Sequence, residues 1–202
     1  MKIAVIGATG RAGREITAEL ARRGHKVTAI ARRPDAAPPS PLVDPVVGDV
    51  SDPSGLAAIL AGHDAVVSAV HFLDSDPEKL VGAVRASGVR RYLVVGGAAS
   101  LEVAPGKKLI DQPNFPKEYE AEARAGIGFL DYLRGVEDLD WTFLSPAALL
   151  FEGPRLGTFR LGEDMLVANA EGSSISFADY AIALVDEIEK PQHVRRRFAV
   201  GY

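Results

Sequence analysis

Residues 2–13 read KIAVIGATGRAG and contain the strongest indication of fold in the chain. The apolar run at 2–6 is typical of a strand that is buried on both faces. From Arg11 to Arg23 apolar residues recur at helical spacing, and Gly24 favours the end of that helix. Glycines at positions 7, 10 and 13 lie between and at the start of these elements. The stretch therefore predicts a strand, a glycine-rich turn and a helix in succession.

The same alternation continues along the chain and predicts the fold class. Residues 32–45 contain five prolines and are expected to form an exposed loop. Strands that alternate with helices indicate an α/β, Rossmann-like doubly wound domain with a parallel sheet. We expect one domain over residues 1–202, with 147–177 as a small extension on the substrate side. Further strands are expected at 25–31, 46–50, 64–70, 90–97, 140–146 and 196–201, and further helices at 53–62, 77–87, 116–134 and 177–189.

The composition narrows the classes of partner. A formal net charge of -4 argues against nucleic acid, because nucleic-acid-binding proteins usually carry a basic face. The basic cluster Arg195 to Arg197 is expected at a solvated strand edge. The chain has no cysteine, its histidines lack ligand spacing, and no apolar stretch approaches the length of a membrane span. We therefore expect a soluble, cytoplasmic protein with no metal site and no membrane or nucleic-acid partner.

The glycine-rich turn is also a candidate phosphate-binding loop. Backbone N–H groups at a helix N-terminus attract anions through their unpaired donors and the helix dipole. Gly7 permits the tight turn, Gly10 lets a diphosphate approach the main chain, and Gly13 lets the helix pack on the strand. The spacing is G-x-x-G-x-x-G, whereas the more familiar dinucleotide motif is G-x-G-x-x-G. The alternative is a structural turn that binds no nucleotide.

Two arginines bear on the choice of nucleotide. Arg32 and Arg33 follow the second predicted strand, where an NAD-binding domain carries an acidic residue. Because a guanidinium suits the 2′-phosphate, the sequence favours NADP(H) over NAD(H). Asp35 leaves NAD(H) as the alternative. Asp49 follows the third predicted strand, and its carboxylate is expected either beside the adenine amine or as the cap of a local turn.

Longer stretches resemble a known family. They are KIAVIGATGRAG, GDVSD, VVGGAASLEVAPG, LDWTFLSPAALLFEGPRLGTFRLG and ISFADYAIALVDEIEKPQHVRRRFAVGY, and together they extend from one end of the chain to the other. With these stretches the chain resembles the atypical short-chain dehydrogenase/reductase superfamily, in its NmrA-like, NAD(P)H-binding branch. Within that branch it is similar to the group provisionally named NADH-flavin reductases.

The resemblance implies a set of cofactor contacts. The group's name indicates NADH, whereas Arg32 indicates NADPH. By the resemblance, the diphosphate would be bound by Gly7, Ala8, Thr9, Gly10, Arg11, Ala12 and Gly13. The 2′-phosphate would be bound by Arg32, and the adenine by Asp49 and Val50. The ribose and nicotinamide would be bound by Ala69, Val70, His71, Gly96, Gly97, Ala98, Pro146, Ala147 and Ala148.

The catalytic pair of the superfamily, Tyr-x-x-x-Lys, is missing. Tyr119 is followed four residues later by Ala123, and Tyr132 by Val136. Reduction of a ketone requires a proton donor at the developing alkoxide. A flavin delocalises the incoming charge, so stacking FMN, FAD or a quinone-like ring on the nicotinamide can suffice. The absence of the Tyr-x-x-x-Lys pair therefore favours a small aromatic acceptor.

Other candidate residues and functions stay open. His71, Ser100 and Tyr119 are weak catalytic candidates, and each has an ordinary structural interpretation as a loop, turn or solvent-facing residue. Residues 149–175 would form the wall opposite the cofactor, with Phe151 and Phe159 as stacking or packing residues. The leading hypothesis is an NADPH-dependent flavin or quinone reductase. The alternatives are a non-catalytic NADP(H) redox sensor and an extended-type sugar-nucleotide epimerase or dehydratase. A homodimer is considered because folds of this kind often pair.

Overall fold

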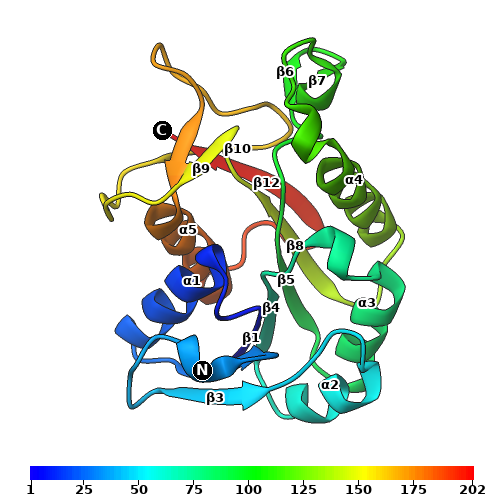
Figure 1. Cartoon of the computed structure of the whole chain (residues 1–202), viewed down its shortest axis with the longest axis vertical. Helices are drawn as coiled ribbons and strands as arrows, with labels where there is room; N and C mark the ends of the chain where they lie inside the picture. Colours follow the sequence, from blue (N-terminus) through cyan, green and yellow to red (C-terminus); the bar gives the residue numbers. More distant parts are fainter.

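The computed structural model describes residues 1–202 and has an eight-stranded sheet at its centre (Figure 1). Neighbouring strands in this sheet are parallel, except for an antiparallel pair at one edge. In spatial order, starting with that pair, the strands are β10 (Arg160–Gly162), β12 (Arg196–Gly201), β8 (Asp140–Ser145), β5 (Arg91–Val95), β4 (Ala65–Ser68), β1 (Lys2–Ile6), β2 (Lys26–Ala31) and β3 (Val43–Val47).

The strand order confirms the predicted fold class. From β1 the chain adds β2 and β3 on one side, and then adds β4, β5, β8 and β12 on the other. The direction of strand addition therefore reverses between β1 and β4. In doubly wound sheets this reversal leaves a crevice outside the carboxyl ends of the strands, where ligands bind. The chain is a Rossmann-like α/β domain.

Helices cover both faces of the sheet and enclose two apolar cores. One core lies under α1 and α5 and the other under α2, α3 and α4, in agreement with the two groups of helices in Figure 1. The fully buried Tyr180 on α5 packs in the first core and donates a hydrogen bond from its hydroxyl to the carbonyl of Leu144 (2.7 Å). The helices are α1 (Arg11–Arg22), α2 (Pro53–Leu60), α3 (Pro77–Ala86), α4 (Glu120–Arg134) and α5 (Phe177–Glu189).

Side-chain caps fix where three of these helices begin. Asp52 accepts a hydrogen bond from the amide of Gly55 (3.0 Å), and Asp76 accepts one from Glu78 (2.9 Å). Ser176 accepts from the amide of Asp179 at the start of α5. A short polar side chain at this position satisfies an otherwise unpaired helical N–H group. The predicted starts of α2, α3 and α5 are therefore confirmed.

Short elements extend the carboxyl edge of the sheet. A two-stranded parallel sheet joins β9 (Leu149–Phe151) to β11 (Ser174–Ser176), within the expected substrate-side segment. An antiparallel pair that the sequence did not reveal joins β6 (Glu102–Ala104) to β7 (Lys107–Lys108). The 3₁₀ turns are Pro34–Ala36, Phe72–Asp74, Leu109–Asp111 and Lys117–Tyr119.

The third strand and the fourth helix differ from the prediction. The strand begins at Val43, inside the expected proline loop, and ends at Val47. It tolerates Pro45 because β3 is an edge strand, where a missing N–H group need not break a second ladder. The fourth helix begins at Glu120, after the 3₁₀ turn Lys117–Tyr119, because tighter turns are frequent at helix N-termini.

The arginine cluster near the C-terminus is only partly solvated, so that prediction was wrong for Arg197. Its side chain is 5% exposed and pairs with Asp164, with 2.8 Å between Nε and Oδ1. The guanidinium also donates to the hydroxyl of Ser100 (3.3 Å). Arg197 thus ties β12 to the loops at the carboxyl edge of the sheet.

Candidate functional site

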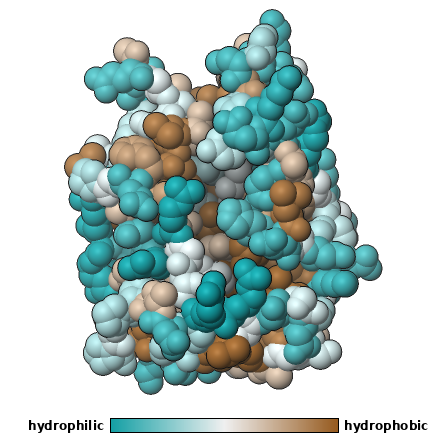
Figure 2. All heavy atoms as spheres, viewed as in Figure 1, coloured by the Kyte–Doolittle hydropathy of each residue, from teal (hydrophilic) through white to brown (hydrophobic).

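A cleft of about 620 Å³ lies at the carboxyl ends of β1, β2, β4 and β5, where the direction of strand addition reverses. Figure 2 shows it as a groove down the middle of the molecule, with polar side chains along its rims. The predicted cofactor residues that line it are Gly7, Thr9, Gly10, Arg11, Ala12, Arg32, Asp49, Val50, Ala69, Val70, His71 and Gly96.

Other predicted residues do not line this cleft. Ala8 and Ala147 are buried in the core under α1 and α5. Arg33 lines a small adjoining hollow together with Arg32. Two catalytic candidates also lie elsewhere: Ser100 is buried beside Arg197, and Tyr119 is 64% exposed on its 3₁₀ turn. The predicted cofactor residues outside the lining also include Gly13, Gly97, Ala98, Pro146 and Ala148.

The glycine loop allows the structural and ligand-binding roles of its glycines to be separated. A Cβ atom on Gly7, which has φ +80°, would lie 2.5 Å from the carbonyl oxygen of Ala69. A Cβ on Gly13 would collide with the carbonyl of Gly7. The fold alone thus requires these two glycines. Gly10 is different, because its Cβ would meet nothing closer than 3.4 Å. A Cβ there would make only ordinary contacts with the carbonyl oxygens of Gly7 and Ala69, so the fold does not require this glycine.

The backbone at the start of α1 presents unpaired donors. Gly10 is the N-cap of α1 and supplies no side-chain hydrogen bond, and its carbonyl accepts from the amide of Arg14 (2.9 Å). The amides of Arg11, Ala12 and Gly13 donate to no group of the protein. Free amides at a helix N-terminus favour a phosphate group. The loop therefore fits a dinucleotide diphosphate.

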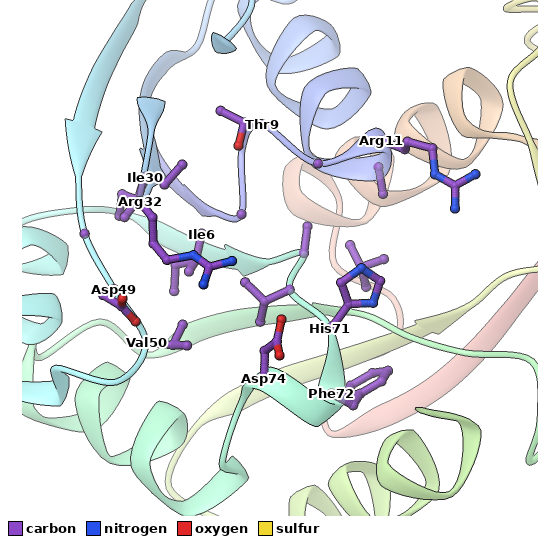
Figure 3. Close-up of a pocket in the computed structure, with 18 of the residues that line it drawn as sticks. Ile6, Thr9, Arg11, Ile30, Arg32, Asp49, Val50, His71, Phe72 and Asp74 are labelled. Atoms are coloured by element: carbon purple, nitrogen blue, oxygen red, sulfur yellow. The ribbon is translucent and has the colours of Figure 1, made fainter. Parts of the chain in front are cut away.

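Arg32 and Asp49 lie together at one end of the cleft (Figure 3). The exposed Arg32 guanidinium points into the cleft and forms no ion pair within the protein. One oxygen of Asp49 accepts from the amide of Ser51 (2.9 Å), so the expected local cap exists. This hydrogen bond lowers the pKa of the Asp49 carboxyl, and the charge of Arg32 adds to the effect. Asp49 thus keeps a charged carboxylate at the cleft.

The loop after β4 is held to α4 by one carboxylate. Glu122 accepts hydrogen bonds from the amides of Phe72 (2.7 Å) and Leu73 (3.0 Å), and one of its oxygens lies 3.4 Å from Nδ1 of His71. Figure 3 shows His71, Phe72 and Asp74 around this part of the cleft. Sequence reasoning missed Phe72, Asp74 and Glu122, because about 50 residues separate the loop from its partner on α4.

At the end of the cleft opposite Arg32, apolar residues from several segments lie beside His71, Glu122 and Arg11. These apolar residues are Val95, Leu150, Phe72 and Phe177. The guanidinium carbon of Arg11 lies 5.3 Å from the centroid of the Phe177 ring.

The two phenylalanines that the sequence nominated for stacking are placed elsewhere. Phe151 packs edge-on against Tyr202, with 6.5 Å between ring centroids, and Phe159 packs against the core under α1 and α5. Leu150 and Phe177 line the cleft in their place.

Polar contacts attach the segment after β9 to α1 and α5. Arg155 donates to both oxygens of the buried Glu19 carboxylate on α1 (3.0 and 2.9 Å). The amide of Gly157 donates to Asp179 on α5 (2.8 Å). Burial raises the pKa of Glu19, but hydrogen bonds from Arg155 and Arg23 outweigh it, so the pKa lies below its ordinary value. These contacts hold residues 152–159 along α1 and α5.

The histidine, aspartate and glutamate side chains form no group of three or more that could hold a metal ion. None of the helices combines the length and the apolar character that a membrane crossing requires.

Comparison with known families agrees with this geometry. A family described as NAD(P)H-binding matches residues 7–191, which include the glycine loop, Arg32 and most of the cleft lining. The chain belongs to this NAD(P)H-binding family of atypical short-chain dehydrogenases/reductases. The family explains why the glycine loop, the strand order and the cleft occur together.

Similar solved structures share the whole fold. A Burkholderia pseudomallei protein, provisionally described as exported, is 47% identical and has a TM-score of 0.90, with 100% of both chains covered. A Bacteroides thetaiotaomicron protein, provisionally named an epimerase, is 36% identical (TM-score 0.94, 100% and 96% covered). A Streptococcus pneumoniae protein, provisionally named an NADH-flavin reductase, is also 36% identical (TM-score 0.83, 100% and 99% covered).

Proposed function

We propose that this protein is an oxidoreductase that uses NADPH to reduce a flat aromatic acceptor, such as a flavin or a quinone. Membership of the family makes it an NAD(P)H-binding, oxidoreductase-like protein. The preference for NADPH and the class of acceptor are the parts that we add. When bound, the dihydronicotinamide of NADPH supplies a hydride.

The observation that carries the proposal is the contrast between the two ends of the cleft. At one end the free guanidinium of Arg32 suits a 2′-phosphate, and the free amides of Arg11 and Ala12 suit the diphosphate. At the other end Phe72, Leu150 and Phe177 offer an apolar surface. This arrangement orients a dinucleotide along the cleft and leaves the apolar end for a ring.

The acceptor class follows from chemistry that the chain lacks. No Tyr-x-x-x-Lys pair is present, and of the three catalytic candidates only His71 lines the cleft, with Glu122 3.4 Å from its Nδ1. A ketone would need a donor at its oxygen, whereas a flavin or quinone spreads the added charge over its ring. The provisional name of the Streptococcus pneumoniae relative agrees with a flavin acceptor. The provisional name of the Bacteroides thetaiotaomicron relative favours the epimerase alternative.

The proposal is tested by following the absorbance of NADPH with FMN, FAD, riboflavin and a soluble quinone in turn. We expect protein-dependent oxidation with at least one acceptor, and a lower KM for NADPH than for NADH. The matched controls are the same mixtures without protein and with Arg32→Ala. Tight NADPH binding without turnover on any acceptor contradicts the reductase and supports the redox sensor. Conversion of a sugar nucleotide without net NADPH consumption supports the epimerase.

A further inference from the structure

Arg11 is a second cationic group of the cleft, at the end opposite Arg32. In Figure 3 the side chain of Arg32 points in from β2, whereas that of Arg11 extends from the start of α1 in the direction away from Arg32. Phe177 is the first residue of α5, and its ring lies against the Arg11 guanidinium and lines the cleft together with Leu150. Arg11 therefore lies at the end of the cleft with Phe72, Leu150 and Phe177, which we call the acceptor end.

The guanidinium of Arg11 is held in place but carries no compensating anion. It lies over the Phe177 ring at 5.3 Å, a distance at which a cation is attracted to an aromatic face. The side chain forms no hydrogen bond or ion pair within the protein. Arg11 is thus oriented by Phe177, and its five N–H donors are free.

The acidic groups of the cleft do not neutralise this charge. Glu122 already accepts from the amides of Phe72 and Leu73, and His71 lies beside one of its oxygens. Asp49 accepts from Ser51 at the adenine end. Asp74 also lines the cleft and has no ion pair with Arg11. A ligand anion at the acceptor end would therefore meet an unpaired guanidinium.

The other phosphate groups of NADPH have their own partners. The free amides at the start of α1 suit the diphosphate, and Arg32 suits the 2′-phosphate. Neither assignment requires the side chain of Arg11, which is directed toward Phe177. The remaining candidate for Arg11 is an anion on the acceptor.

We infer that Arg11 binds the phosphate group of a phosphorylated flavin, and that the acceptor is therefore FMN-like rather than riboflavin or a neutral quinone. This inference rests on the proposed function and narrows its substrate class. The isoalloxazine ring would lie against Leu150, Phe72 and the cofactor, and the phosphate would reach the guanidinium near the mouth of the cleft. Guanidinium and phosphate form strong, paired hydrogen bonds.

Flavin fluorescence tests the inference without turnover. Wild-type protein saturated with NADP⁺ is titrated with FMN and with riboflavin, and quenching reports binding. We expect FMN to bind about tenfold more tightly than riboflavin, because charge-assisted hydrogen bonds have roughly that effect. Arg11→Gln should remove the difference by weakening FMN alone, and Arg11→Lys should retain part of it. Arg14→Gln, an exposed arginine on the same helix, should leave it unchanged.

Two results would overturn the inference. One is equal affinity of the wild-type protein for FMN and riboflavin. The other is an Arg11→Gln variant whose affinity for NADPH, measured separately by calorimetry, falls by the same factor as its affinity for FMN. Arg11 would then belong to the cofactor site. An Arg11-dependent preference for FMN without any NADPH oxidation supports the phosphate site and contradicts only the reductase.

Discussion

The end of the cleft that we propose for the nucleotide is formed mainly by consecutive residues of one strand–turn–helix unit, whereas the proposed acceptor end combines segments that are far apart in the sequence. Gly7, Gly10 and the first amides of α1 belong to a single local structure. At the acceptor end Phe72, Leu150 and Phe177 come from three separate segments. Long-range polar contacts such as those of Glu122 and Glu19 hold those segments in place. A local motif thus specifies one end, and tertiary contacts specify the other.

The largest expected effect concerns the 2′-phosphate. Arg32→Ala should raise the Kd for NADPH by roughly 10- to 100-fold, because a charge-assisted contact is lost, and should change the Kd for NADH by less than about threefold. Titration calorimetry with both nucleotides measures the two effects. Arg14→Ala is the matched control, since this exposed arginine on α1 lines neither the cleft nor the hollow beside Arg32. An equal loss for both nucleotides would remove the assignment of Arg32.

The glycine loop allows stability and binding to be separated by two substitutions. Gly7→Ala should lower the free energy of unfolding by roughly 1–3 kcal/mol, because its φ is +80° and its Cβ would meet the carbonyl of Ala69. Gly10→Ala should leave stability nearly unchanged, because its Cβ meets nothing closer than 3.4 Å, but should weaken NADPH binding about tenfold by crowding the approach of the diphosphate to the main chain. Thermal unfolding and calorimetry check the pair. Undiminished binding by a folded Gly10→Ala protein would indicate a purely structural turn.

The contact between the β4 loop and α4 gives a smaller effect at the acceptor end. Glu122→Gln keeps the side chain's shape but removes its charge and one of two acceptor oxygens. We expect amide hydrogen exchange at Phe72 and Leu73 to rise about 5- to 10-fold, with global stability reduced by less than about 1 kcal/mol. Glu118→Gln, at an exposed glutamate on the preceding turn, is the control. Unchanged exchange at both amides would show that Glu122 does not hold the loop.

The smallest expected effect is the acid dependence of stability through Glu19. Because the folded-state pKa of this carboxyl is lowered, its contribution is present above the ordinary glutamate pKa and is lost as the pH falls through the lowered value. Glu19→Gln should flatten the acid side of the stability curve by up to about 1 kcal/mol. Urea unfolding at several pH values measures this, with Glu15→Gln on the same helix as control. A curve as steep as that of the wild-type protein would exclude Glu19 as a source of the dependence.

The sequence was sufficient for the fold and for predicting most of the residues that the fold brings together at the Arg32 end of the cleft, because both depend on local patterns. Apolar runs, helix caps and glycines act within a few residues of each other, as at Asp52 and Gly7. The third strand was misplaced because Pro45 resembles a strand breaker, and only the edge position of β3 makes it tolerable.

The acceptor end was less predictable for the same reason. Nothing near Glu122 in the sequence indicates that it will bind the amides of Phe72 and Leu73. Phe177 has the pattern of a core residue at the start of a helix, although it also lines the cleft. Arg197 looks solvated until the fold brings Asp164 beside it. These contacts exist only after the distant segments have packed.

Calorimetric titration of the wild-type protein with NADPH and with NADH tests the central claim most directly. The account predicts heat from one site per chain and an affinity for NADPH at least about tenfold higher than for NADH, because only NADPH carries the phosphate that Arg32 can bind. The absence of heat for either nucleotide at millimolar concentration would contradict it.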